Sequence, residues 1–554
     1  MTTTESSEKG WRRHWPLMLL LAVTALSYAR LWSVGWSWDD EALILDNQVT
    51  GSLWNIGQFF THDLWGTTQL SELKSGYYRP LMLLTLAVDR AIFPEISSQA
   101  GATLSHIHSL VWHLGAVAAL YAVLVRMFVP VTAATGALLL ALHPLNAEVL
   151  ALVAARNDSM AALFTLAAMW MVMDRTARPG RLLGAGLLFL AGLLSKESAI
   201  LGPVMLLTLD LARWRRPGDL IRYLPFVLSA GVYFALRSLA DINQGISLSA
   251  GIGHLQDNLL GLVALYGKLL VWPWPLTPAR HISYLPPASE NLLGLVLCLG
   301  LLGAAITRGK QRALVVAGLV WAGLAFAPSL AATLDKGLLG ERYLYFSMAG
   351  LGLMLVAAVP QPPRWLVPAL AIPAILALQL RLPQWQNSRT VWEAAHAASP
   401  SPFTAAGLAW YYHRDGDLDK ANPLLVYALE GEPPYRDVCD LIVMSHLQAK
   451  QTEEAARLAA WAVRERGCPP RGMIIDHWAV ALAGMGQWSE AVQVAMQQPG
   501  GPAGPGRVVV AAAQARTGQI DAVRQQAAAS GDPQYLARVA RMLRLGGEPE
   551  AAEA

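Results

Sequence analysis

Apolar runs alternate with short charged clusters through about the first 382 residues of the chain. The first run extends from Trp15 to about Val34, directly after a basic N-terminal segment. Further runs lie near residues 104–125, 130–143, 157–173, 182–195, 198–212, 222–240, 290–307, 313–333, 343–360 and 365–381. A straight transmembrane helix needs roughly 20 apolar residues. The pattern predicts an all-α, polytopic membrane domain of about 11 transmembrane helices over residues 1–382.

Basic clusters predict the orientation of these helices. If successive apolar runs cross the membrane in opposite directions, the basic clusters lie on the same side as the N-terminus. These clusters are Arg126; Arg175, Arg178 and Arg181; Arg213, Arg215 and Arg216; Arg308, Lys310 and Arg312; and Arg364. Lys and Arg are enriched in cytoplasmic loops, so we expect a cytoplasmic N-terminus. Segment 259–276 would break the alternation if it spanned the membrane, and prolines interrupt its end. We expect it to lie at the outer interface or to re-enter the membrane.

The sequence changes character after residue 382, where polar residues, Ala and Gln replace the apolar runs. The strings GDLDKA (416–421), KQTEEA (450–455), GQWSEA (486–491) and GQIDAV (518–523) recur at spacings of 34, 36 and 32 residues. A period near 34 residues, with a tight turn followed by a small packing residue, is typical of tetratricopeptide repeats. We therefore expect an extracytoplasmic α-solenoid of about four repeats over residues 383–550.

The chain has three cysteines, too few for a disulfide framework. Cys439 and Cys468 lie at the two ends of the second predicted repeat. In an antiparallel helix pair these ends are adjacent. Either a disulfide or two free buried thiols is compatible with this spacing.

Composition narrows the class of protein. The chain is 54% hydrophobic and 15% charged, whereas soluble domains have about 25% charged residues. Its formal net charge of +3 does not favour a nucleic-acid-binding protein. The sequence contains neither a Gly-rich phosphate loop nor an alternating strand–helix pattern, the features that would indicate a nucleotide-sugar domain.

Three adjacent acids, Asp39, Asp40 and Glu41, follow the first apolar run at the start of the predicted outer loop 35–103. Capping of a helix N-terminus would explain one of these carboxylates. Three at a bilayer surface repel one another unless cations or a substrate proton offset them. Other predicted outer loops carry further polar residues: Arg79, His143, Glu148, Arg156, Asp158, Lys196, Glu197, Arg280, His281, Glu341 and Arg342.

Eight strings occur in a defined order: DD…ILDN (39–47), DLWG (63–66), YRPL (78–81), HP…AEV (143–149), RND (156–158), LSKE (194–197), ERYLY (341–345) and R…W (389–392). Together with the repeats, they resemble the transmembrane and tetratricopeptide-repeat O-mannosyltransferases of the class C glycosyltransferase superfamily. The chain departs from that family at Ala155, where Gly is usual, and in its shorter repeat array.

The resemblance implies that a sugar, mannose by default, passes with inversion from a polyprenyl-phosphate donor to Ser or Thr hydroxyls of extracytoplasmic proteins. It implies a periplasmic reaction at a bacterial inner membrane, with an acceptor protein bound by the repeats. By likeness the general base is Asp39 or Asp40, and we favour Asp40. The residues implied to bind the donor phosphate are Arg79, Arg156, Lys196 and Arg342, supported by Glu41, His143, Glu148, Asp158 and Glu197.

Three alternatives remain open. A divalent cation, Mg or Mn, held by Asp39 and Asp40 with Glu148 or Asp158, would neutralise the phosphate in place of the basic side chains. A membrane scaffold without enzymatic activity would use the repeats alone to assemble an envelope machine. A transferase with the same chemistry would act on a lipid or glycan acceptor.

Overall fold

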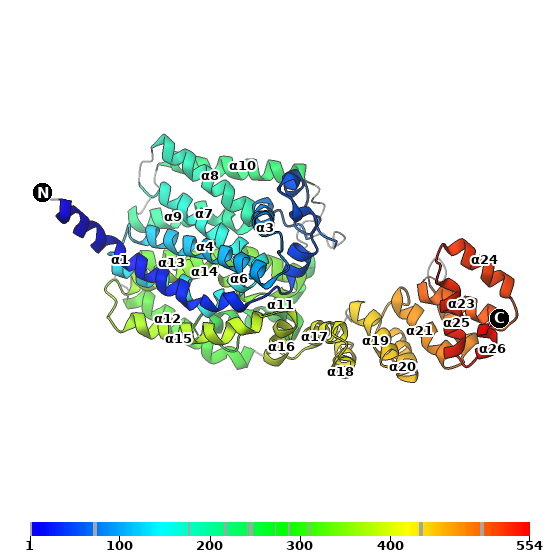
Figure 1. Cartoon of the computed structure of the whole chain (residues 1–554). Helices are drawn as coiled ribbons and strands as arrows, with labels where there is room; N and C mark the ends of the chain where they lie inside the picture. Colours follow the sequence, from blue (N-terminus) through cyan, green and yellow to red (C-terminus); the bar gives the residue numbers. More distant parts are fainter. Residues whose placement is uncertain are drawn as a thin grey trace. The chain divides into compact units, whose positions relative to one another are not determined.

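The structure of the chain is a computed structural model that describes residues 3–69, 75–174, 178–214, 219–240, 242, 248–271, 273–285, 288–308, 311–431, 436–498 and 504–553. Helices dominate it, which confirms the all-α prediction (Figure 1). In the described residues two short strands, β1 (Arg280–His281) and β2 (Leu338–Leu339), pair antiparallel with Arg280 opposite Leu339. The chain divides into two compact units, Met1–Ala394 (unit 1) and Ala395–Ala554 (unit 2).

The boundary between the units lies later than the predicted residue 382. Residues after the last apolar run are held in unit 1 by the segment that carries the acidic string. The backbone N–H of Gly35 donates to the Gln386 carbonyl at 3.0 Å, and that of Trp38 donates to Ser388 Oγ at 2.8 Å. Residues 383–394 therefore belong structurally with the membrane-type helices.

Unit 1 is a helical bundle whose main helices are α1 (Thr3–Ser27), α3 (Pro80–Ile92), α4 (Gln99–Leu124), α5 (Pro130–Leu142), α7 (Asn157–Met171), α8 (Pro179–Ser195), α9 (Gly202–Trp214), α10 (Leu224–Leu239), α11 (Leu248–Val271), α12 (Ala288–Arg308), α13 (Arg312–Lys336), α14 (Ser347–Ala358) and α15 (Leu366–Arg381). Proline begins α3, α5 and α8, where its missing N–H costs no helical hydrogen bond. Helices α4, α7 and α8 pack in succession (Figure 1).

Glycines allow other helices of unit 1 to approach closely. A Cβ added at Gly318 of α13 would lie 2.6 Å from the Gly350 carbonyl of α14, and one at Gly352 would lie 2.3 Å from the Gly136 carbonyl of α5. Small residues at such crossings are typical of membrane helix packing. Helices α5, α14 and α13 thus form a closely packed layer of the bundle.

Five described helical stretches are long and apolar enough to cross a membrane: His14–Ser33, Gln99–Leu124, Leu220–Leu239, Arg312–Leu330 and Leu366–Trp385. Pro130–Leu142 with Pro144–Ala151 makes a sixth if this pair, bent by 49°, is one span. An integral membrane protein is supported, while the count of about 11 stays a prediction. Several predicted runs, such as those of α8 and α14, form shorter apolar helices.

Parts of the topology prediction cannot be placed. Arg175, Arg215, Arg216 and Lys310 lie outside the described residues. The predicted interfacial segment 259–276 begins within α11, which packs against α12 and α13. Its position relative to the bilayer stays a prediction.

Unit 2 is a succession of helix pairs: α17 (Pro402–Arg414) with α18 (Leu418–Ala428), α19 (Arg436–Gln448) with α20 (Thr452–Arg464), α21 (Met473–Gly484) with α22 (Trp488–Ala495), α23 (Gly504–Arg516) with α24 (Ile520–Ser530), and α25 (Tyr535–Leu545) with α26 (Pro549–Glu553). Each helix packs on the next one, and the first helices of neighbouring pairs also pack on each other (Figure 1). This is the packing that a repeat array requires.

The predicted repeat strings fall on the turns within these pairs. Gly416, Gly486 and Gly518 have φ values of 80°, 77° and 82°, and Lys450 occupies the equivalent turn with φ 59°. This left-handed conformation favours Gly because it has no Cβ. A further pair, α25–α26, follows the four predicted repeats; it turns at Gly547, and its second helix has five residues.

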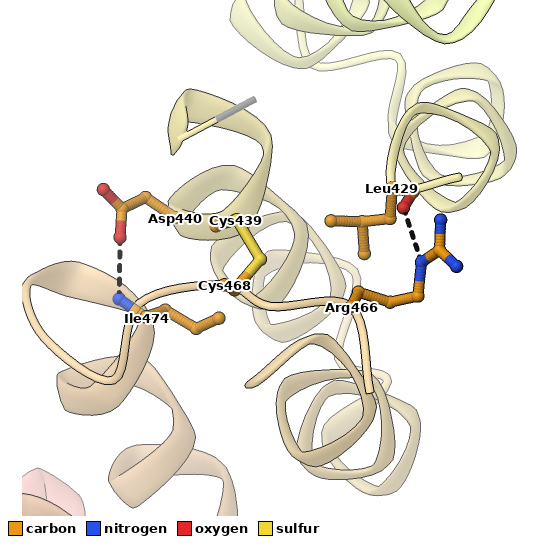
Figure 2. Close-up of a disulfide and its surroundings, with 6 residues drawn as sticks. All are labelled: Leu429, Cys439, Asp440, Arg466, Cys468 and Ile474. Atoms are coloured by element: carbon orange, nitrogen blue, oxygen red, sulfur yellow. Dashed lines mark hydrogen bonds between the residues drawn. A yellow bond between two sulfur atoms is a disulfide. The ribbon is translucent and has the colours of Figure 1, made fainter. Parts of the chain in front are cut away.

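A disulfide joins Cys439 of α19 to Cys468, which follows α20 (Figure 2). The Cα atoms are 5.8 Å apart. Of the two alternatives left open by the sequence, the structure therefore has the disulfide. Neighbouring hydrogen bonds tie this helix pair to the pairs on either side: Asp440 accepts the Ile474 N–H at 2.9 Å, and Arg466 Nε donates to the Leu429 carbonyl at 2.7 Å.

Replacing both Cys439 and Cys468 by Ser is expected to lower the free energy of unfolding of this helix pair by ~3 kcal/mol, the chain-entropy value for a loop of this size. Native-state hydrogen exchange of α19 and α20 would measure the change. The wild-type protein treated with dithiothreitol is the matched control and should behave in the same way. Free thiols at both positions in the unreduced protein, detected by alkylation and mass spectrometry, would contradict the assignment.

Candidate active site

The acidic string follows an unusual backbone turn at Trp38. This residue has φ 51°, a left-handed conformation that is strained for a bulky side chain and is characteristic of functional sites. The Trp38 N–H donates to Ser388 Oγ, and its ring packs against Trp392 with centroids 5.3 Å apart. A short π-helix, Glu41–Leu45, follows. These contacts hold the backbone directly before the acidic residues.

The three carboxylates have different environments. Asp40 is fully buried and accepts the N–H groups of Val153 at 3.2 Å and Ala154 at 2.7 Å. Glu41 accepts a hydrogen bond from the Ser388 hydroxyl. Asp39 alone of the three lines a cavity. This carboxylate is thus placed to meet a ligand in that cavity.

That cavity has a volume of about 380 Å³. Six residues singled out from the sequence line it: Asp39, Arg79, Asp158, Lys196, Glu197 and Arg342. Aromatic residues Trp65, Tyr77, Tyr233, Phe234 and Tyr343 form much of the remaining wall. Residues from several separate segments of the chain therefore meet in one charged and aromatic chamber.

Each of the three predicted cations of the cavity is paired with a carboxylate. Lys196 Nζ lies 2.5 Å from Asp158 Oδ1. Arg79 donates through Nε and Nη2 to Glu197 Oε2 at 3.1 and 2.9 Å. Arg342 Nη1 lies 2.5 Å from Glu148 Oε1. Such charge-assisted bonds hold the cations in fixed positions.

Burial alters the pKa values of the cavity groups. Desolvation raises the pKa of Asp39, although Arg342 partly opposes this shift. Burial lowers the pKa of Lys196, against the effect of Asp158. Desolvation also raises the pKa of Asp40 to about 7, even though two backbone N–H groups favour its carboxylate. A raised pKa makes Asp39 a stronger proton acceptor than an ordinary aspartate.

Two predicted site residues lie elsewhere. Arg156 is fully buried, where it pairs with Asp89 Oδ2 at 2.7 Å and donates to the Ser105 carbonyl. Arg156 does not line the cavity, so it is not among the basic side chains that surround Asp39. His143 stands at the break after α5, where its Nδ1 accepts the Leu145 N–H at 3.4 Å. It acts as a cap at that break.

The sequence did not single out Arg237, which also lines the cavity. It lies in the last turn of α10 and donates to the Gly76 carbonyl at 2.7 Å. Unlike the other cations, it forms no ion pair with a carboxylate of the described residues. In the sequence, the feature that could have identified Arg237 is its position as a lone Arg near the end of an otherwise apolar run.

A second cavity of about 420 Å³ shares Asp39, Trp65, Tyr77, Arg342 and Tyr343 with the first. Arg280, Trp38 and the β2 strand add to its wall. Glu341 does not line it, since this buried carboxylate accepts from Arg381 Nη2 at 3.0 Å and from the Thr277 N–H. Asp39 and Arg342 thus border both cavities.

The residues named for a divalent cation do not form a coordination set. Asp40 directs its oxygens to backbone N–H groups, while Glu148 and Asp158 are paired with basic side chains. Within the described ranges, no group of three or more His, Cys, Asp or Glu side chains is arranged to hold a metal ion. In the structure these carboxylates have other partners, and the divalent cation stays an alternative left open by the sequence.

Comparison with known proteins adds a family relationship. Residues 85–238 match the family described as dolichyl-phosphate-mannose-protein mannosyltransferase. The chain is similar to protein O-mannosyl-transferase TMTC3 of Mus musculus (28% identical over 151 residues) and Homo sapiens (26% over 153), and to human TMTC4 (25% over 166).

Each of these alignments covers 27% of this chain, 16% of TMTC3 and 22% of TMTC4, so the chain spans less than a quarter of its relatives' length. No solved structure matches the chain. The resemblance stated from the sequence strings is confirmed for the aligned part. Residues 85–238 of this membrane chain are homologous to protein O-mannosyltransferases.

Proposed function

We propose that the chain is a membrane glycosyltransferase that moves a sugar, mannose by family likeness, from a polyprenyl phosphate to Ser or Thr hydroxyls of extracytoplasmic proteins. The observation that carries the proposal is the position of Asp39. It is a carboxylate of raised pKa that borders two cavities, beside basic side chains suited to a phosphate. The mannosyltransferase match over residues 85–238 supports the same reaction.

In the proposed reaction, the acceptor hydroxyl transfers its proton to Asp39 as its oxygen forms a bond to C1 of the sugar. The bond between C1 and the phosphate oxygen breaks on the opposite face, which inverts the anomeric centre. The polyprenyl phosphate leaves with the bonding electron pair. General-base catalysis of this kind contributes about 10²- to 10⁴-fold to a rate.

The basic side chains would stabilise the charge that develops on the phosphate. Arg79, Lys196 and Arg342 are already fixed by their carboxylate partners, so they need little reorganisation during the reaction. Glu148, Asp158 and Glu197 act as positioning residues for these cations. Asp40 positions the segment around Val153 and Ala154, and Asp39 replaces it as the proposed base.

A lipid-linked donor suits the apolar side of the cavity. Tyr233 and Phe234 of α10 line it, and the Phe234 side chain is 56% exposed. Helix α10 belongs to a stretch long and apolar enough to cross a membrane. A polyprenyl chain could therefore pass along α10 while its phosphate reaches the basic groups.

We further propose that unit 2 is a tetratricopeptide-repeat array that binds the acceptor protein. An extracytoplasmic position is supported by the Cys439–Cys468 disulfide, because disulfides persist in oxidising compartments. This position agrees with about eleven spans, a cytoplasmic N-terminus and a reaction on the periplasmic side of a bacterial inner membrane.

The proposed function is tested by incubating the purified protein in nanodiscs with a radiolabelled polyprenyl-phosphate mannose and Ser- and Thr-containing peptides. We expect the label to appear on peptide hydroxyls, and no label when GDP-mannose replaces the lipid donor. Label on lipid or glycan acceptors, but not on peptides, would favour the alternative transferase. No transfer from mannose, glucose or galactose lipid donors would favour the scaffold.

Replacing Arg237 by Gln is expected to raise the KM for the lipid donor about tenfold, because a charge-assisted bond to phosphate is worth roughly 1.5–3 kcal/mol. Initial rates at varied donor concentration would measure this change. Arg237→Lys should retain part of the affinity. Arg181→Gln, which removes an exposed Arg paired with Asp174, is the matched control and should leave the KM unchanged. An unaltered KM in Arg237→Gln would remove Arg237 from the donor site.

A further inference from the structure

Unit 2 contains a groove of about 1020 Å³ lined mainly by the first helices of successive pairs, α19, α21, α23 and α25. We propose that this groove binds an extended, acidic peptide segment. The proposal rests on the proposed function, in which unit 2 receives the acceptor protein, and it specifies the chemistry of that partner.

The charge of the groove differs from that of the unit that contains it. Four of its lining residues are basic, Lys450, Arg507, Arg538 and Arg541, and one is acidic, Asp532. Asp532 is paired with Arg538. The other three basic side chains are exposed and form no ion pair with the described residues.

Residues 395–554 as a whole contain 14 Lys and Arg against 17 Asp and Glu. The basic residues of the groove are thus concentrated on one surface of an acidic unit. A positive patch of this kind selects a negatively charged partner and steers its approach.

Between these charges the groove is apolar. Leu447, Val480, Val508 and Met542 line it, while Gln448 and His477 offer polar contacts. Apolar contacts along a concave surface between separated cations suit a single extended chain, whose successive side chains point to opposite faces. Acidic side chains would meet Lys450, Arg507 and Arg541, and apolar ones would contact the floor.

The experiment measures binding to the full-length protein in nonionic detergent by fluorescence anisotropy. The probe is a twelve-residue peptide with six Asp or Glu residues and two Leu residues, labelled with an uncharged dye. A second peptide has Lys in place of each acid. We expect the acidic peptide to bind more tightly than the Lys peptide, and its affinity to fall as the salt concentration rises.

The double variant Arg507→Glu, Arg541→Glu is expected to weaken binding by at least about tenfold. The matched control is Arg524→Glu, Arg544→Glu, which makes the same charge changes in α24 and α25 at positions that do not line the groove and should bind normally. Circular dichroism of both variants should show unchanged helicity.

Equal binding of the acidic and Lys peptides would overturn the proposal, as would equal loss in the two double variants. Displacement of the bound peptide by anionic vesicles, but not by the unlabelled acidic peptide, would instead assign the surface to a membrane and overturn the proposal. Because no sugar donor is present, the result is independent of transferase activity. A protein that binds the peptide but transfers no sugar would retain this inference and lose the proposed function.

Discussion

Replacing Asp39 by Asn is expected to lower kcat for sugar transfer by about 10²- to 10⁴-fold, the usual contribution of a general base. The amide has nearly the same shape as the carboxylate but cannot take the proton of the acceptor hydroxyl. Since Asp39 lines the cavity and is partly exposed, whereas Asp40 is fully buried, we expect the melting temperature to change little. Transfer from the labelled lipid donor, measured together with thermal unfolding, would test both expectations.

Asp40→Asn provides the matched control. Both carboxylate oxygens of Asp40 accept backbone N–H groups, and an amide nitrogen would face one of these donors. This leaves a buried N–H without a partner, at a cost of about 1–3 kcal/mol. We therefore expect a lower melting temperature in Asp40→Asn. A fully active Asp39→Asn variant, with an inactive but normally stable Asp40→Asn, would return the role of base to Asp40.

The pH dependence of the wild-type enzyme gives a second readout for Asp39. The carboxylate must be unprotonated to act as a base, and desolvation in the cavity raises its pKa. The rate should thus fall as the pH is lowered, with a midpoint above the ordinary pKa of aspartate, about 4. The residual activity of Asp39→Asn should lack this acidic limb. An identical limb in the variant would assign the titration to another group.

Much of the architecture was readable from local sequence patterns. The turns that divide the helix pairs of unit 2 fall at the predicted strings because Gly, or Lys450 in its place, occurs at each left-handed position. The proximity of Cys439 and Cys468 followed from the length of one helix pair. These features depend on residues close together in the chain, so their spacing carries the information.

The candidate site was less predictable because it depends on side-chain direction and on distant partners. The left-handed turn at Trp38 comes directly before Asp39, which lines the cavity, and Asp40, which accepts backbone N–H groups, and no local sequence pattern predicts this turn. Arg156 is neutralised by Asp89, which lies 67 positions earlier on another helix. The string that contains Arg156 is part of the family resemblance, yet the Arg156 side chain forms a buried ion pair inside the bundle.

The ion pairs explain how a cavity can hold several cations before a donor arrives. An unpaired charge buried in the protein is costly, and a carboxylate partner offsets much of that cost. Arg237 is the exception among the cations of this cavity, since its described contact is the Gly76 carbonyl. Because no carboxylate of the described residues pairs with Arg237, we expect this residue to affect donor binding most directly.

Replacing Arg342 by Gln is expected to lower kcat by about 10²- to 10³-fold, the magnitude seen when one donor of a charge-stabilising site is removed. Arg342 borders both cavities and interacts electrostatically with Asp39. The substitution also leaves Glu148, which is 1% exposed, without its partner. Loss of one member of a buried pair destabilises a protein by about 3–5 kcal/mol, so the single variant alone cannot separate catalysis from folding.

The double variant Arg342→Gln, Glu148→Gln separates the two effects, because it removes both charges and leaves no buried carboxylate unpaired. We expect its melting temperature to recover towards that of the wild type while its kcat stays low. The effects of the two substitutions on stability would then not add, as is characteristic of residues in direct contact. Recovery of both stability and activity would show that Arg342 acts only through the fold, and the phosphate-stabilising role would then pass to Lys196 and Arg79.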